Sequence, residues 1–199
     1  MTQTTASATT STTATTTPSG LRSLYLIRVV YSLIWVALVF TTSASLKSTD
    51  TPTVIAAVLL GIYPLWDVIA TLLERRMAGT GSMSRVSAIN IAFGLAATVG
   101  MIIAASSTIG TALLVFGIWA LLSGAIQLVV AIRRRRTVGA QWPMIISGGL
   151  SILAGASVAS MSGSATSGLS TVAGYSAFGA FWFLVSVIAL TLRARRAQR

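Results

Sequence analysis

The acidic residues limit any chemistry that this chain could perform. The sequence of 199 residues contains three carboxylates, Asp50, Asp67 and Glu74, and neither cysteine nor histidine. Thiolate nucleophiles, the usual general base and the commonest ligands of transition metals are therefore missing. The hydropathy pattern places the carboxylates in an outside loop, within an apolar segment and at a cytoplasmic helix end, which predicts neither a paired-carboxylate catalytic site nor a carboxylate-rich metal site. We therefore expect no enzyme activity, no catalytic residue, no metal and no cofactor.

Asp67 is the carboxylate that falls inside an apolar segment. It lies eight residues before Arg75, which corresponds to about 12 Å along a helix. Asn90 and Gln127 lie at a similar depth when counted from the arginines next to their own segments. Three polar side chains from three segments therefore share one layer of the membrane.

An ionisable side chain at this depth needs a partner, because its insertion costs roughly 2.5 to 3.5 kcal/mol. Arg28 and Arg85 belong to the ends of two other segments and can extend inward, so they are the candidate counter-ions. One interpretation is an ion pair of Asp67 with an arginine, supported by Asn90 and Gln127, which fixes how the helices align. A second is a protonatable Asp67 on a proton or substrate path, and a third is a water-exposed Asp67.

The elements that position these residues are recognised from the basic residues, which mark alternate breaks in the apolar sequence. Only Lys47 lies at another break, and the remaining basic residues are Arg22, Arg28, Arg75, Arg76, Arg85, Arg133, Arg134, Arg135, Arg136, Arg193, Arg195, Arg196 and Arg199. Short cytoplasmic loops of membrane proteins carry the excess of Lys and Arg. The pattern predicts six spans with both termini in the cytoplasm.

The composition supports a membrane protein. Hydrophobic residues make up 54% and charged residues 9% of the chain, whereas about a quarter of the residues in soluble domains are charged. The net charge of +11 comes from arginines beside apolar runs. We therefore expect the lipid bilayer and anionic lipid head groups as partners at the cytoplasmic arginines, and no nucleic acid.

The hydropathy pattern divides the chain into a tail and a membrane domain. Residues 1–20 are almost entirely Thr, Ser and Ala, which predicts a disordered cytoplasmic tail. Residues 21–199 are predicted to form an all-α bundle of six transmembrane helices. Similar Gly-apolar-aromatic openings at Gly61, Gly117 and Gly179 suggest three helical hairpins. The predicted spans are about 24–46, 54–73, 86–105, 111–132, 142–161 and 169–192.

Small residues recur at every fourth position in two spans. One stripe consists of Ala88, Ala92, Ala96, Gly100 and Ala104, and the other consists of Ser147, Ser151 and Gly155 with Ala159. Such stripes let helix backbones approach closely in lipid. Spans three and five are therefore the predicted packing centre, whereas span one, with Tyr31, Trp35 and Phe40, is predicted to lie at the lipid-facing periphery.

The second half of the chain carries a recognisable series of features. Residues 115–136 (VFGIWALLSGAIQLVVAIRRRR) have a Gly-apolar-Trp opening, a Ser-Gly pair and a basic turn, and residues 141–159 (QWPMIISGGLSILAGASVA) have an early Trp and a glycine-rich helix. In these features the chain resembles the HdeD-like acid-resistance membrane protein family. The resemblance implies a small six-helix protein of the bacterial inner membrane and an expectation of a role in acid resistance. It brings no catalytic or ligand-binding residue.

Three functional hypotheses follow. The first is a non-enzymatic inner-membrane protein that supports acid or envelope stress tolerance. The second is a small transporter or channel that uses Asp67. The third is a scaffold that binds a second copy or another membrane protein through the small-residue helix faces.

Overall fold

The structure is a computed structural model that describes residues 18–77 and 84–197, and these residues form six helices. The helices are α1 (Pro18–Thr42), α2 (Val54–Met77), α3 (Arg85–Ala104), α4 (Ile109–Arg134), α5 (Trp142–Ser160) and α6 (Leu169–Ala197). Each is long and apolar enough to cross a membrane. The predicted all-α, six-span fold is confirmed. Most of the predicted tail lies outside the described residues, and its last three residues begin α1.

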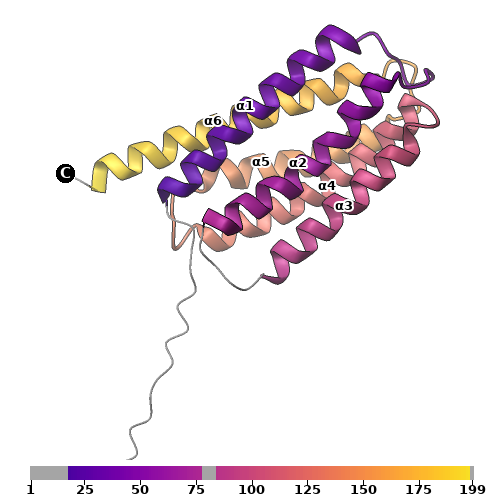
Figure 1. The fold of residues 1–199 in the computed structure, drawn as a ribbon. Coiled ribbons are helices and arrows are strands. Elements are labelled where there is room, and N and C mark those ends of the chain that lie inside the picture. Colours follow the sequence, from indigo (N-terminus) through magenta and orange to yellow (C-terminus); the bar gives the residue numbers. More distant parts are fainter. Residues whose placement is uncertain (1–17, 78–83, 198–199) are drawn as a thin grey trace, which may run out of the picture.

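The helices run alternately up and down, so their arginine-bearing ends gather at one end of the bundle (Figure 1). We call this the arginine-rich end. The most extensive packing joins α4 with α5, α1 with α6, and α2 with α3. The helices within each predicted hairpin also touch, but less extensively. Most of the packing in the bundle therefore joins one hairpin to another, and less of it joins the two helices of one hairpin.

Glycines bring the backbones of α4 and α5 into contact. A Cβ atom built on Gly117 would lie 2.7 Å from the carbonyl oxygen of Gly155, and one on Gly155 would lie 2.7 Å from that of Gly117. Gly124 and Gly148 face each other in the same way, with 2.9 Å in both directions. Helices in lipid associate through such close packing. The packing centre is therefore the α4–α5 pair, and the prediction that span three shares it is wrong.

The small-residue stripe of span three does not form a tight helix contact. Its members Ala88, Ala92 and Ala96 are exposed, Gly100 is half-buried, and Ala104 at the end of the helix is buried. A Cβ atom on Gly100 would lie 3.3 Å from the side chain of Val115 in α4. Helix α3 instead turns Gly94 toward α2, where an added Cβ would meet Val68 and lie 3.4 Å from the carbonyl oxygen of Pro64. The shape of the neighbouring helix decides which face is buried.

In span five the predicted packing residues do pack. Ser147 is buried, and the Cβ of Ser151 would lie 2.7 Å from a Cβ atom built on Gly124. The hydroxyl of Ser151 also accepts a hydrogen bond of 3.1 Å from Tyr175 of α6. Helix α5 therefore contacts α4 along this stripe and is linked to α6 by the same serine.

Helix α1 lies at the core on one face, which corrects the prediction that it is peripheral. Trp35 is 1% exposed, and its Nε1 donates to the carbonyl oxygen of Leu59 at 2.8 Å. Tyr31 donates to the carbonyl oxygen of Ile62 at 3.1 Å. Both acceptors lie within five residues of Pro64, although the carbonyl that this proline leaves without its usual partner is that of Leu60, four residues before it. The two aromatic residues therefore tie α1 to the backbone of α2 in this region.

At the opposite end of the bundle, the loop after α1 caps two other helices. The backbone carbonyls of Asp50 and Ser48 accept hydrogen bonds of 2.8 and 2.7 Å from the N–H groups of Ile109 and Gly110 at the start of α4. The carbonyl of Leu46 accepts from Leu169 at the start of α6 at 3.1 Å. These amides have no partner within their own helices. One loop therefore joins three hairpins at this end.

The arrangement of the arginines predicts the orientation in the membrane. Because cysteine is absent from the sequence, single cysteines at the exposed positions Thr137, Ser107 and Ala165 can be labelled without background. We expect a membrane-impermeant thiol reagent to label positions 107 and 165 in intact cells, and position 137 only after permeabilisation. Labelling of position 137 in intact cells would contradict the proposed orientation. Ser48 is less suitable because it is buried.

The α4–α5 contact predicts different effects for two glycines of one helix. Gly155→Ala should lower the free energy of unfolding by about 1 to 3 kcal/mol, because the added methyl overlaps the α4 backbone. Gly149→Ala is the control, since an added Cβ there meets nothing within 4 Å. It should be neutral or stabilising. Unfolding by SDS titration of the two purified variants measures this difference, and equal effects would show that the backbones are not in contact.

Candidate functional site

Half-buried polar side chains of α2 and α4 lie in the arginine-rich half of the bundle, whereas the opposite half is packed with apolar residues. The largest fully buried side chains there include Trp35, Leu60, Met101, Leu113 and Phe116. Tyr63 lies among them and contacts Phe116 and Trp119, with ring centroids 5.8 and 5.5 Å apart. A candidate site must therefore lie on the other side of this apolar layer.

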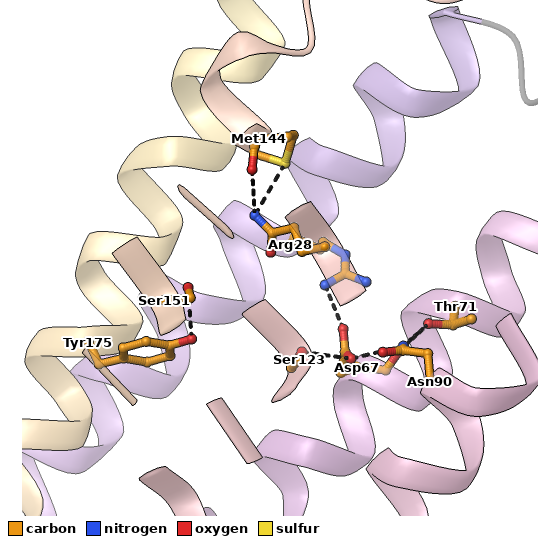
Figure 2. Close-up of polar contacts among 9 residues, drawn as sticks. Arg28, Asp67, Thr71, Asn90, Ser123, Met144, Ser151 and Tyr175 are labelled. Atoms are coloured by element: carbon orange, nitrogen blue, oxygen red, sulfur yellow. Dashed lines mark hydrogen bonds and ion pairs between the residues drawn. The ribbon is translucent and has the colours of Figure 1, made fainter. Parts of the chain in front are cut away.

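Asp67 lies at the centre of the polar half. Its Oδ1 accepts a hydrogen bond of 2.9 Å from Nη1 of Arg28, with which it forms an ion pair. Its Oδ2 accepts from the amide of Asn90 at 3.0 Å, and the hydroxyl of Ser123 lies 3.5 Å away (Figure 2). The partners come from α1, α3 and α4. One carboxylate of α2 thus joins four helices.

Helical periodicity explains why these groups face one another. Asp67, Thr71 and Glu74 follow each other at spacings of four and three residues on α2, which places them on one face. Thr71 donates to the backbone carbonyl of Asp67 at 2.8 Å, and its hydroxyl accepts from Asn90 at 2.8 Å. Ser123 and Gln127 are four residues apart on the facing surface of α4. Two polar stripes therefore run side by side toward the arginine-rich end.

A second ion pair joins these stripes nearer the end of the bundle. Arg134 of α4 donates to Glu74 of α2. The side chains of Arg134 and Glu74 are 30% and 20% exposed, whereas those of Arg28 and Asp67 are 16% and 13% exposed. The pair of Arg134 and Glu74 is thus the shallow pair, and that of Arg28 and Asp67 is the deep pair. The sequence analysis missed the shallow pair, although the spacing of Glu74 from Asp67 was a usable signal.

The two ion pairs line a single cavity of about 110 Å³. Residues from all six helices contribute to its walls. The predicted residues Arg28, Asp67, Asn90 and Gln127 all lie on it. The amide of Gln127 makes two long hydrogen bonds to Met144, one of 3.4 Å to its carbonyl oxygen and one of 3.8 Å to its sulfur. The structure therefore brings together four of the five residues proposed for the polar cluster.

Arg85, the fifth, does not join this cluster. It is exposed at the first position of α3 and is not among the residues that line the cavity. Val86 and Ser87, which follow it, do line the cavity. Successive residues of a helix point in directions about 100° apart, so Arg85 lies beside the face that α3 turns inward. Arg28 is therefore the counter-ion of Asp67. It is one of the two arginines that the sequence predicted for this role.

Aromatic rings hold the guanidinium of Arg28 from the side of α6. Its Cζ lies 5.2 Å from the ring centroid of Phe183, a distance at which a cation is attracted to an aromatic face. Phe183 in turn packs against Tyr25, with ring centroids 5.7 Å apart. Arg28, Tyr25 and Phe183 all line the cavity. The site therefore combines fixed charges, hydrogen-bonding groups and aromatic walls, which suits binding or proton exchange.

A comparison with protein families matches only part of the chain. A family model described as a short repeat of unknown function (DUF308) matches residues 86–160, which contain nearly all of α3 and the whole of α4 and α5. This segment includes Asn90, Ser123 and Gln127, whereas Arg28 and Asp67 lie outside it. No curated protein and no solved structure matches the chain. The matched repeat thus supplies the α4–α5 contact and one wall of the cavity.

The deep ion pair predicts a coupled effect of two substitutions. Asp67→Asn should lower the free energy of unfolding by about 3 kcal/mol, because it leaves the partly buried Arg28 without a counter-ion. Adding Arg28→Gln should recover part of this loss. Asp50→Asn is the control, since Asp50 lies in the loop at the opposite end, where its side chain accepts from the backbone of Lys47. Additive effects of the two substitutions in SDS titrations would argue against the pair.

Proposed function

We propose that this chain is a non-enzymatic, multi-pass protein of the HdeD-like type in the bacterial inner membrane, where it supports acid or envelope stress tolerance. Both termini lie in the cytoplasm in this proposal. The match of residues 86–160 to a short repeat agrees with the resemblance in that part of the chain. The arginine-rich end supports the orientation, since basic loops stay on the cytoplasmic side.

One observation carries the stress role: two carboxylates of the membrane domain, Asp67 and Glu74, line one cavity and are each paired with an arginine. Protonation of either carboxylate removes the counter-ion of a partly buried guanidinium, so an acid challenge acts directly on the contacts between helices. In the proposed orientation the cavity lies toward the cytoplasm, so acidification of the cytoplasm would reach it. The site therefore links proton concentration to bundle packing.

The exposed arginines support a further part of the proposal. Arg133, Arg135 and Arg136 follow one another around the end of α4 and are exposed. Such clusters next to a transmembrane helix attract anionic lipid head groups. We propose these lipids as partners at the arginine-rich end.

The second candidate is a small transporter that uses Asp67, and the cavity that reaches this residue favours it. Transport also requires a path past the apolar layer, where Tyr63, Phe116 and Trp119 are buried and in ring contact. The scaffold hypothesis has less support, because Gly155 meets Gly117 within the same chain and is not free for a partner.

Acid survival of cells that lack the gene tests the stress role. We expect the parent protein and Asp50→Asn to restore survival at low external pH. Asp67→Asn combined with Arg28→Gln should fail, because it removes the titratable pair while leaving no lone charge. Immunoblots of the membrane fraction control for protein level. Equal survival with and without the gene would refute the role.

The same variants decide between the two candidates when they are reconstituted in liposomes with a trapped pH-sensitive dye. The stress role without transport predicts no proton flux above that of empty liposomes. Flux in the parent protein that is lost in the double variant would favour the transporter.

A further inference from the structure

We propose that the cavity between the two ion pairs is a binding site for a small zwitterion, a molecule with one carboxylate and one ammonium group. This inference goes beyond the stress role and does not depend on it. It concerns what the cavity binds, whether or not the protein moves the bound molecule across the membrane.

The charges that line the cavity determine the class of ligand. Two guanidinium groups, of Arg28 and Arg134, and two carboxylates, of Asp67 and Glu74, contribute equal numbers of positive and negative charges. A purely anionic ligand that paired with the arginines would leave the carboxylates without counter-ions. A purely cationic ligand that paired with the carboxylates would leave the arginines without counter-ions. Uncompensated charges are costly in such a setting. A zwitterion can exchange partners with both ion pairs and leave every charge compensated.

Donors and acceptors remain for both ends of such a ligand. The ion pair of Arg28 with Asp67 uses one guanidinium nitrogen, Nη1, which leaves the other donors of Arg28 for a carboxylate. Gln127 adds an amide that is held by two long contacts to Met144. Asn90 uses its Nδ2 for Asp67 and Thr71, so its carbonyl oxygen can accept from an ammonium group. Figure 2 shows Arg28, Asp67 and Asn90 converging from α1, α2 and α3.

The exposure of the two pairs gives the direction of access. The shallow pair, Arg134 and Glu74, is more exposed than the deep pair, Arg28 and Asp67. A ligand therefore enters from the arginine-rich end and meets Arg134 and Glu74 first. The side chains that surround Tyr63 close the other side of the deep pair.

The size of the cavity limits the ligand. Its volume is about 110 Å³, equal to the share of liquid volume of three or four waters at about 30 Å³ each. A lipid chain or a peptide does not fit. A compact amino acid such as glycine or alanine does, with Val86, Ile126 and Val130 beside it as apolar wall residues.

Three probes that differ by one charged group test this proposal on the purified full-length protein in nanodiscs. Glycine carries both groups, acetate lacks the ammonium and methylammonium lacks the carboxylate. At matched ionic strength and pH 7, we expect glycine to raise the unfolding temperature in a saturable manner. Acetate and methylammonium should have little effect. Equal shifts with all three probes, or a glycine effect that never saturates, would overturn the proposal.

Variants separate binding in the cavity from a general effect of the solute. Glu74→Gln combined with Arg134→Gln removes the shallow pair without leaving a lone charge and should weaken glycine binding at least tenfold. Arg135→Gln is the matched control, since Arg135 is exposed and is not a lining residue, and it should bind as the parent does. Equilibrium dialysis with radiolabelled glycine measures this directly. Unchanged binding in the double variant would refute the site, and if that variant fails to fold, the three probes on the parent still decide.

Discussion

The interior of a membrane tolerates a carboxylate only where the protein supplies its partners, and Asp67 imposes this constraint on the whole bundle. Its insertion costs roughly 2.5 to 3.5 kcal/mol, and its partners Arg28, Asn90 and Ser123 belong to three other helices. One side chain therefore links α1, α2, α3 and α4. The cavity lies beside this carboxylate and its partners.

Helix α4 connects this polar cluster to the most closely packed part of the fold. Its glycines, Gly117 and Gly124, meet the backbone of α5, while Ser123 and Gln127 line the cavity. In lipid, such close backbone contact is a main source of helix association, because apolar side chains gain little by leaving lipid for protein. The glycine face therefore anchors α4, and the anchored helix presents its polar face at a fixed position. The packing between α4 and α5 thus offsets part of the free-energy cost of placing charged groups beside the cavity face of α4.

The features that could be predicted from the sequence are those that depend on local residue patterns. Arginines at alternate breaks identify the spans, and the depth of Asp67 identifies Arg28 as one of two candidate partners. Which helix faces touch could not be predicted in the same way, because a stripe of small residues has the same spacing whether it faces a helix or lipid. Ala88, Ala92 and Ala96 in α3 are exposed. Gly155 in α5, in contrast, touches Gly117 of α4.

The shallow ion pair was missed for a different reason, which concerns helix length. The predicted spans ended at Leu73 and Ile132, but the helices continue to Met77 and Arg134. Glu74 therefore keeps the helical spacing that starts at Asp67, and Arg134 is still part of α4. Residues placed at a membrane surface by hydropathy alone can thus face inward when the helix extends beyond the apolar segment. Long charged side chains make this extension possible, since their apolar stems cover the core while their heads reach water.

The two layers of the bundle place different demands on binding and on translocation. Tyr63 and Trp119 lie four residues, about one helical turn, beyond Asp67 and Ser123 on α2 and α4. Their rings are 5.5 Å apart, so the aromatic layer directly adjoins the polar one. A molecule bound between the ion pairs needs no change in this layer. Passage to the other side requires the rings of α2 and α4 to separate, and because α4 is fixed to α5 by backbone contact, the larger displacement falls to α2 and the Trp35 that is hydrogen-bonded to it.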